Sequence, residues 1–327
     1  LKYTRMSLKL ATILFLLMVV VTIFVGTRLP VGLAAPLGAI SIKKWELILL
    51  AYCFVASLLP MWLLLQPRGY LGGWFLYLTI AICLFGALAG GFAIQYPAFY
   101  LDGFKSLANG KLVFPILFIT VACGACSGFH GIVSAGTSSK QIQRESDTRV
   151  VGYGAMLLEA LVAVLALMTV MILKPGNPML KEAPNLIYAN GIAGYMNMVR
   201  IGGVEIGYGL ALSFALLAFS TFVYDTLDVC TRLARYILQE LFGWESQAGA
   251  VVATAISLVL PVVILMVSGK DAYLVAWPIF GTSNQLLASL TLLALSVWLV
   301  RTGCRAIYTV VPMVFMLAVT LWSLILQ

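Results

Sequence analysis

Residues 6–28 read MSLKLATILFLLMVVVTIFVGTR, and between Leu10 and Val25 every side chain is apolar except two threonines. A helix needs about 20 predominantly apolar residues to cross the hydrocarbon core of a bilayer. In lipid only helices and closed barrels satisfy their own backbone hydrogen bonds, and this run is too long and continuous for a barrel strand. The stretch therefore predicts a helix that spans a membrane.

Apolar runs of this kind recur along the chain, with no long polar stretch between them. We expect nine membrane spans, at residues 6–28, 43–65, 72–95, 112–128, 150–173, 206–230, 249–268, 272–300 and 305–326. The predicted fold is therefore an all-α, polytopic bundle of transmembrane helices that forms one domain over residues 1–327.

The composition agrees with this interpretation. The chain is 62% hydrophobic and only 10% charged, with a mean hydropathy of +1.04, whereas soluble domains carry about 25% charged residues. Its net charge is +8, but the basic residues stand singly or in pairs between apolar runs, which is typical of membrane topology. We therefore expect membrane lipid around the protein and no nucleic-acid partner.

The arginines predict an orientation in the membrane, because positive residues concentrate in cytoplasmic loops. If Lys2 is cytoplasmic and the loops alternate, eight arginines lie inside and two outside. Those inside are Arg5, Arg68, Arg144, Arg149, Arg232, Arg235, Arg301 and Arg305, and those outside are Arg28 and Arg200. The polar loop 174–204, rich in Pro and Asn, is then outside and is expected to carry a short helix. Residues 231–247 are expected to continue the preceding helix along the membrane surface.

Residues 123–139, CGACSGFHGIVSAGTSS, place four glycines and four serines around the only histidine of the chain. This pattern predicts a helix that breaks at membrane depth, where the freed backbone groups must line a cavity or meet a ligand. The alternative is close helix packing through the glycines, as in Gly124-xxx-Gly128. The residues expected to bind solute here are Ser127, Gly128, Phe129, His130, Ser134, Gly136, Thr137 and Ser138, with a helix start near Ser134–Ser138 facing a carboxylate.

Two ionisable residues are candidates for proton coupling. His130 is the only side chain whose unperturbed pKa lies near neutrality, so it is suited to relay a proton, although it is equally suited to join two helices. Glu159 lies about nine residues, or about 14 Å, into an apolar run. An acid at that depth indicates a functional site, and its structural alternative is a hydrogen bond to the broken segment.

The run 219–235 carries further candidates for ion or proton coupling, which are Ser220, Thr221, Asp225 and Asp228. Asp228 and Arg232 are four residues apart on one helix, a spacing that predicts a structural ion pair. The hydroxyls of Ser220 and Thr221 either coordinate an ion or solute oxygen, or bond back to their own helix.

The run WPIFGTSNQ, residues 277–285, places a proline and a glycine inside a long apolar segment. A kink there would free backbone groups near Asn284 and Gln285. These two amides are either part of the solute pathway or a link between helices.

Other kinds of site are not predicted. Cys123, Cys126 and His130 offer only three ligands at a helix end, whereas structural zinc sites use four. A membrane hydrolase would need an HExxH motif, a nucleophile with its base, or paired Asp helices, and none of these occurs in the sequence. We therefore expect neither a metal, nor a cofactor, nor an enzymatic activity.

Four segments resemble the carbon starvation protein A (CstA) family of membrane transporters. They are SGFHGIVSAGTSSKQI (127–142), Glu145-x-Asp147 followed by GYGAMLLE (152–159), TLDVCTRLARYILQE (226–240) and WPIFGTSNQLLA (277–288). That family is linked to uptake of peptides or pyruvate with proton coupling. It is distantly similar to LeuT-like transporters, in which inverted repeats and discontinuous helices meet at a midplane site.

The resemblance implies a multi-pass transporter of the bacterial inner membrane that imports a pyruvate-like carboxylate or short peptides with protons. It also implies a LeuT-like core whose N-terminal helices lie outside this sequence, with residues 123–139 as the sixth core helix. The alternatives are a Na⁺-coupled transporter and a membrane sensor or channel. A second Gly-rich broken helix in the N-terminal part would favour the transporter, and a soluble domain would favour the sensor.

Overall fold

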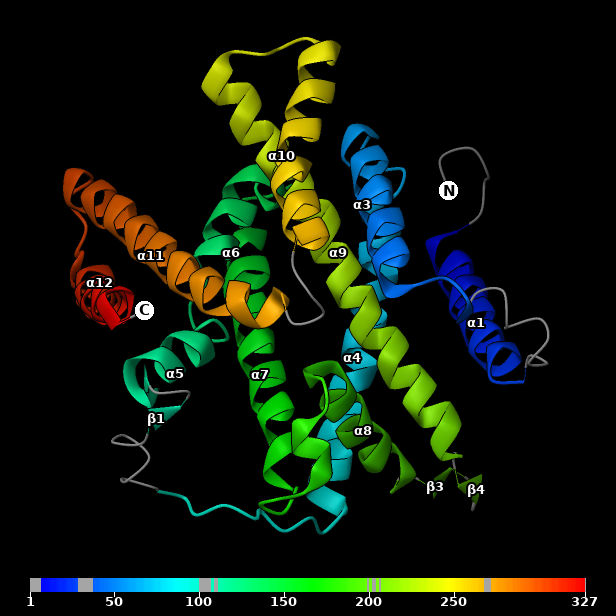
Figure 1. Ribbon diagram of the computed structural model, residues 1–327. Helices are drawn as coiled ribbons and strands as arrows, with labels where there is room; N and C mark the ends of the chain where they lie inside the picture. Colours follow the sequence, from blue (N-terminus) through cyan, green and yellow to red (C-terminus); the bar gives the residue numbers. More distant parts are fainter. Residues whose placement is uncertain are drawn as a thin grey trace. The chain divides into compact units, whose positions relative to one another are not determined.

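The computed structural model describes residues 7–28, 38–99, 107–108, 111–198, 200–201, 204–205, 207–267 and 272–326. These residues are almost entirely helical, which confirms the all-α prediction (Figure 1). The strands are two-residue antiparallel hairpins, β1 (Leu107–Ala108) with β2 (Lys111–Leu112) and β3 (Arg200–Ile201) with β4 (Val204–Glu205).

Seven helices in the described residues are long and apolar enough to cross a membrane. They are α1 (Leu8–Gly26), α4 (Leu65–Ala89), the helical stretch Arg149–Met171 that contains α7 (Ala155–Met171), α9 (Tyr208–Phe242), α10 (Gln247–Val267), α11 (Ala272–Arg301) from Ala276 onward, and α12 (Ile307–Leu326). Each overlaps one of the predicted spans, so the polytopic membrane assignment is confirmed.

Two of the nine expected spans are shorter than predicted. Helix α3 (Ile42–Leu58) has 17 residues and ends before Pro60, and α4 begins only after a turn at 61–64. Helix α5 (Val113–Ala122) has 10 residues, or about 15 Å, which is half of the hydrocarbon core. Of the nine expected spans, seven are therefore found among the described residues. The end of α3 was not predicted, because the residues around Pro60 are themselves apolar, whereas α5 ends at the break expected within residues 123–139.

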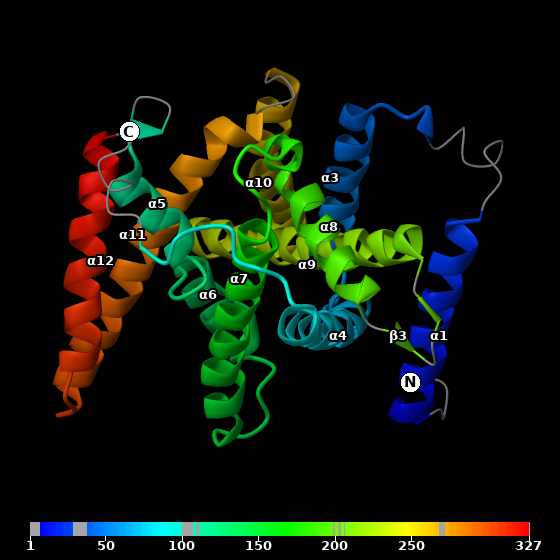
Figure 2. The same ribbon diagram turned by 90° about the horizontal axis from the view of Figure 1, so that it is seen from below.

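The described helices belong to two compact units. The first unit contains residues 1–96 and 165–262, in which α3, α4 and α8 (Pro184–Asn197) pack against α9. Both views show α4 and α8 beside α9 (Figures 1 and 2). Helix α8 comes from the loop predicted at 174–204, and it is more deeply buried than a loop helix is expected to be. Four of its side chains, Ala189, Ile192, Ala193 and Tyr195, are 0% exposed.

Close packing explains how α8 is buried. A Cβ atom at Gly86 of α4 would come within 2.9 Å of the Tyr195 Cα, so only glycine admits this approach. A Cβ atom at Gly191 of α8 would likewise overlap the side chain of Thr169 of α7. The short helix therefore serves as part of the helical core of this unit.

Helix α9 has 35 residues, or about 52 Å, and exceeds the thickness of the hydrocarbon core. It runs without interruption through residues 231–242, so the preceding helix continues as predicted but ends at Phe242 and not at residue 247, and its placement along the membrane surface stays a prediction. The next residue, Gly243, adopts the left-handed conformation at φ 65°, and the Trp244 N–H then bonds to the Gln239 carbonyl at 2.8 Å.

The second unit contains residues 97–164 and 263–327, in which α11 packs against α12, α5 and α6 (Gly128–Val133). Helices α11 and α12 lie side by side in both views (Figures 1 and 2). The Ser296 hydroxyl of α11 donates to the Thr309 hydroxyl of α12 at 2.7 Å. Polar contacts of this kind hold membrane helices together, because lipid provides no hydrophobic drive for their association.

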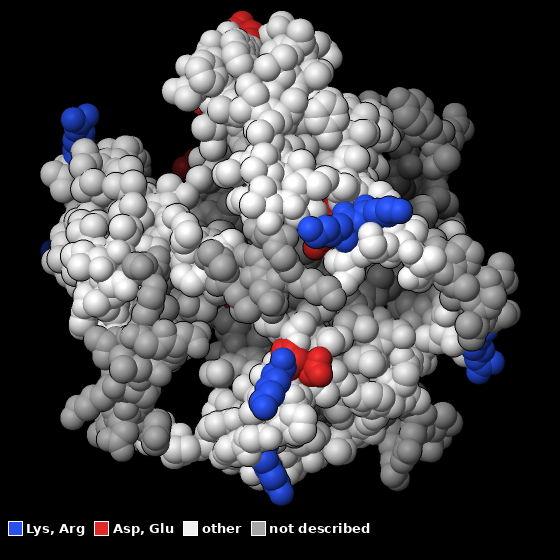
Figure 3. All heavy atoms as spheres, in the orientation of Figure 1, with Lys and Arg blue, Asp and Glu red and all other residues white. Residues whose placement is uncertain are grey.

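The surface is that of a membrane protein. Large apolar side chains along the spans are exposed, including Val20 at 61%, Leu260 at 66% and Trp298 at 60%. Lys, Arg, Asp and Glu are few and scattered on the face in Figure 3. An exposed apolar surface of this extent indicates contact with lipid.

Candidate functional site

The predicted break lies at residues 123–127. Helix α5 ends at Ala122, residues 123–125 form a turn, and Ser127 is extended at φ −120°, ψ 129° before α6 begins at Gly128. Residues 134–138 continue α6 as a π-helical turn. The expected helix start near Ser134–Ser138 is therefore wrong, because the chain is already helical there and its backbone groups are engaged.

Asn284 of α11 satisfies the polar groups that the break exposes. Its side-chain carbonyl accepts from the Phe129 N–H at 2.8 Å and from the Ser127 hydroxyl at 3.2 Å, and its amide approaches the Cys123 sulfur at 3.5 Å. Asn284 is only 5% exposed. A side chain of another helix thus performs the task of an N-cap. Asn284 thus links two helices, which is one of the two roles predicted for it, and its part in a solute pathway stays a prediction.

The glycines of this segment allow helices to approach closely. A Cβ atom at Gly128 would lie 2.6 Å from the Leu287 Cβ and nearer still to the backbone of α11. One at Gly124 would lie 2.6 Å from the Ala163 Cβ of α7. The packing role expected as the alternative is therefore present beside the break, and both features share the same residues.

His130 and Glu159 are brought together in this unit. The His130 Nδ1 lies 3.0 Å from the Glu159 Oε2, with side-chain exposures of 38% and 32%. The Nδ1 has no aligned hydrogen-bond partner among the described residues, so the contact is an ion pair only when His130 carries a proton on both ring nitrogens. Glu159 is about 15 Å along the span that starts at Arg149, which is mid-depth in a bilayer. Two residues selected separately from the sequence thus form one pair.

The other predicted residues of this unit have different surroundings. The Ser134 and Thr137 hydroxyls bond back to the Gly131 and Val133 carbonyls, at 2.8 Å each. Gly136 lies in the π-helical turn, and Ser138 lines a cavity of 360 Å³. Gln285 is 0% exposed, and neither of its amide atoms has a hydrogen-bond partner among the described residues.

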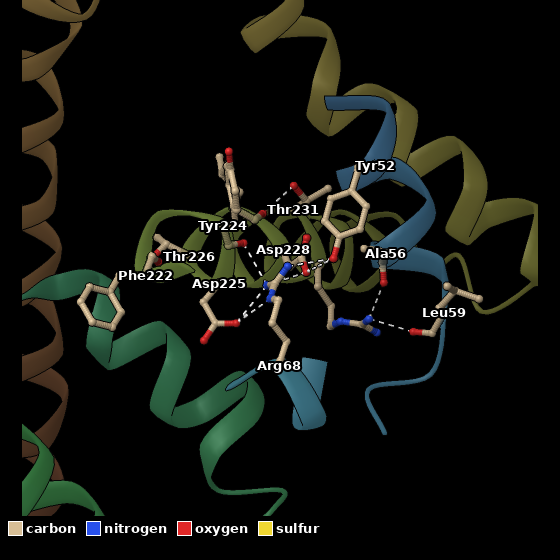
Figure 4. Close-up of polar contacts among 12 residues, drawn as sticks. Tyr52, Ala56, Leu59, Arg68, Phe222, Tyr224, Asp225, Thr226, Asp228 and Thr231 are labelled. Carbon is tan, nitrogen blue, oxygen red and sulfur yellow. Dashed lines mark hydrogen bonds and ion pairs between the residues drawn. The ribbon is translucent and has the colours of Figure 1, made fainter. Parts of the chain in front are cut away.

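A second cluster of polar side chains lies in the first unit, around Arg68 of α4 (Figure 4). The Arg68 Nε and Nη2 reach the Asp225 Oδ1 at 3.0 and 2.9 Å, and Nη2 reaches the Asp228 Oδ2 at 2.7 Å. The Arg68 Nη1 donates to the Tyr52 hydroxyl at 2.8 Å, and that hydroxyl donates to the Asp228 Oδ2 at 3.2 Å. We call these four residues the Arg68 cluster. It joins α3, α4 and α9.

The predicted Asp228–Arg232 ion pair is corrected by this geometry. Asp228 pairs with Arg68, while the Arg232 Nη2 donates to the carbonyls of Ala56 and Leu59 at 2.6 and 2.8 Å. These carbonyls are at the C-terminus of α3, where the helix leaves acceptors unpaired and the dipole favours a cation. Arg232 is therefore a cap for a neighbouring helix, and the i, i+4 spacing was not sufficient to predict its partner.

Ser220 and Thr221 bond back to their own helix, which is one of the two roles predicted for them. Their hydroxyls donate to the Leu216 and Leu217 carbonyls of their own helix, at 2.8 and 2.9 Å. Thr221 and Asp225 face the glycines of α4, since a Cβ atom at Gly72 would lie 3.4 Å from Thr221 and 3.7 Å from Asp225.

Tyr52 and Arg68 of this cluster were not predicted from the sequence. Arg68 stands between two predicted spans and was counted as a loop arginine, and Tyr52 lies in an apolar run with no polar neighbour. The only signal was an excess of acids at 225–228, which require a cation from elsewhere. Within the described ranges, His, Cys, Asp and Glu form no group of three or more that suits a metal ion.

The fold and these contacts define a class: a polytopic helical membrane protein with an interrupted helix and ionisable side chains paired within its helical units. The chain belongs to the CstA family, described as carbon starvation protein CstA, whose model matches residues 1–185 and 177–323.

The chain is also similar in sequence to named transporters of bacteria. The peptide transporter CstA of Helicobacter pylori strain J99 is 32% identical over 337 residues, which cover 85% of this chain and 49% of the relative. The pyruvate/proton symporter BtsT of Escherichia coli K12 is 32% identical over 356 residues, covering 84% and 49%. The peptide transporter CstA of Bacillus subtilis strain 168 is 30% identical, covering 88% and 54%.

The chain spans about half the length of the curated relatives it matches. Its multiple spans and its bacterial relatives identify it as a multi-pass protein of the inner membrane. No solved structure matches the chain.

Proposed function

We propose that this chain is part of a secondary active transporter that imports a pyruvate-like carboxylate or short peptides together with protons. The observation that carries the proposal is the His130–Glu159 contact of 3.0 Å, at mid-depth of a span and beside an interrupted helix. Ionisable residues at that depth are costly, and they typically mark ion or proton pathways. The names of the relatives, peptide transporter and pyruvate/proton symporter, support the same class of solute.

The solute is proposed to bind beside residues 123–138, and the fold is proposed to be a LeuT-like core. An irregular backbone at membrane depth occurs where it is buried in protein or lines a cavity, as in the discontinuous helices of such transporters. The partly exposed His130 and Glu159 are next to this segment, so a proton on their pair and a solute at the break would interact electrostatically.

Uptake by proteoliposomes tests the proposal directly. Vesicles containing the protein are given labelled pyruvate or labelled dialanine, with and without an imposed pH gradient, acid outside, and with a Na⁺ gradient in a separate arm. Accumulation that follows the pH gradient is expected. Uptake that ignores the pH gradient would remove the proton role, and accumulation that follows Na⁺ alone would replace H⁺ with Na⁺.

Glu159→Gln is expected to abolish gradient-driven accumulation, because an amide neither takes up nor releases a proton. Solute exchange between the two sides needs no net proton movement, so counterflow of labelled against unlabelled solute is expected to persist. The folded yield, measured by size-exclusion chromatography in detergent, is expected to remain near that of the wild type.

Glu245→Gln is the matched control, since Glu245 is an exposed acid in the connection between α9 and α10. It is expected to accumulate solute as the wild type does. If Glu159→Gln also accumulates solute against its gradient, the His130–Glu159 pair is not the coupling site.

A further inference from the structure

The Arg68 cluster holds more negative than positive charge. One guanidinium faces two carboxylates, which leaves one net negative charge when both are ionised. The other titratable groups that face Asp228 are Tyr52 and the buried thiol of Cys53, both on α3. Neither is a cation, and Arg232 directs its Nη2 to the carbonyls of α3. The four residues of the cluster thus carry one net negative charge among themselves, and the buried guanidiniums of Arg232 and Arg235 follow Asp228 by four and seven residues on α9.

Asp228 has a vacant position for a proton. Its side chain is 3% exposed, and its Oδ2 accepts from Tyr52 and Arg68. Its Oδ1 is buried and has no hydrogen-bond partner among the described residues. A bare anionic oxygen away from water is strongly disfavoured. A proton on this oxygen removes that penalty and neutralises the excess charge of the cluster.

Asp225 is held less firmly than Asp228. Its side chain is 33% exposed, and its Oδ1 contacts only Arg68, through the Nε and Nη2 atoms. Its Oδ2 faces the glycine side of α4, where a Cβ atom at Gly69 would lie 3.5 Å away. The edge formed by Nε and Nη2 is one by which an arginine grips a carboxylate with two parallel hydrogen bonds. Asp225 contacts this edge through Oδ1 alone, and Nη2 is shared with the Asp228 Oδ2 and with the Tyr224 carbonyl, to which it donates at 3.0 Å (Figure 4).

We propose that Arg68 binds the carboxylate of the transported solute by exchange with Asp225, and that a proton on Asp228 accompanies it. This inference rests on the proposed function and assigns a second place where solute and proton meet. A carboxylate entering alone would double the net negative charge of the cluster. A carboxylate that enters with one proton leaves the net charge of the cluster unchanged. The energetic cost of unbalanced charge therefore couples binding of the carboxylate to protonation of Asp228.

The cluster lies near the start of α4 and in the middle of α9. Asp225 lies about 26 Å along α9 from Tyr208, and Arg68 is three residues into α4. Pyruvate and a peptide both carry a carboxylate, and the chemistry at Arg68 is the same for either.

Equilibrium binding to the purified protein tests this inference. The probes are labelled pyruvate and labelled dialanine at a series of pH values, with pyruvamide and dialanine amide as competitors that lack the carboxylate. The wild type is expected to bind the carboxylates more tightly as the pH falls and to bind the amides at least about tenfold more weakly. Binding of only one of the two carboxylates would identify the solute.

Three variants separate the roles. Arg68→Lys keeps the charge but loses the two-atom edge, and is expected to lose about tenfold in carboxylate affinity while its weak binding of the amides is unchanged. Asp225→Asn removes the competing carboxylate and is expected to raise the affinity about threefold. Asp228→Asn mimics the protonated acid and is expected to remove the pH dependence of binding. Glu245→Gln is the control and is expected to match the wild type.

The opposite results overturn the inference. If Asp225→Asn does not tighten carboxylate binding and Asp228→Asn keeps the pH dependence, the cluster only fastens three helices. If Arg68→Lys fails to fold, the two Asp variants decide the matter, because both leave Arg68 with one carboxylate. If the wild type neither binds nor accumulates either solute, it is the proposed function that fails.

Discussion

At the residue scale, single polar side chains make hydrogen bonds to backbone groups that water would make in a soluble protein. Asn284 supplies the acceptor for the Phe129 N–H, which would otherwise be unpaired at the start of α6. Such a bond contributes about 1 kcal/mol when made, but a buried N–H left unpaired costs about 1–3 kcal/mol. Gly128 makes this bond possible because it brings α6 onto the backbone of α11.

Gly128→Ala is therefore expected to destabilise the protein by about 1–3 kcal/mol, because the added methyl group overlaps the α11 backbone. The change is measured as a lower midpoint of thermal unfolding in detergent. Gly194→Ala in α8 is the control, since a Cβ atom there meets nothing within 4 Å and alanine favours the helix. Equal stability of both variants would contradict the close approach of α6 and α11.

At the element scale, helix ends in this protein are completed by other helices. The C-terminus of α3 is completed by Arg232 of α9, which is 4% exposed and bonds to two carbonyls. The N-terminus of α6 is completed by Asn284 of α11. In lipid a helix end without such a partner is costly, so these cross-helix caps determine where α3 and α6 can end.

Arg232→Met is expected to cost about 1.5–3 kcal/mol, because it leaves the Ala56 and Leu59 carbonyls without their charged donor. Hydrogen–deuterium exchange is expected to increase at residues 55–60 and to change little in α11. Arg301→Met, an exposed arginine at the end of α11, is the control. Unchanged exchange at 55–60 in Arg232→Met would show that α3 ends without help from α9.

At the scale of the whole molecule, the spans determine which connections lie on the same side of the membrane. Helix α9 runs from the segment that contains α8 to the connection at 243–246, and its length of about 52 Å exceeds the thickness of the hydrocarbon core. The arginine distribution predicts the first connection outside and the second inside.

Substituted cysteines test this orientation in intact cells. A cysteine in place of Lys181 is expected to react with a membrane-impermeant maleimide, and one in place of Glu245 is expected to react only after the cells are opened. The wild type measures the background labelling of the native cysteines, of which Cys230 and Cys304 are exposed. The reverse pattern would invert the orientation predicted by the arginines.

Most of the membrane spans were predictable from the sequence, because hydropathy sums over neighbouring residues and needs no knowledge of the fold. The break at 123–127 was predictable for the same reason, since glycine, serine and alanine are local signals. The break that ends α3 was not placed correctly, because Pro60 changes the average hydropathy very little.

The sequence by itself determined that this protein lies in a membrane and which segments form most of its spans. It also determined that four ionisable residues need partners there, namely His130, Glu159, Asp225 and Asp228. Only the tertiary structure decided which partners they have. Arg68 and Asp225 are 157 positions apart in the chain, and Asn284 is 155 from Phe129. Contacts over such separations depend on how helices pack, and helical periodicity carries information only about neighbours on the same helix.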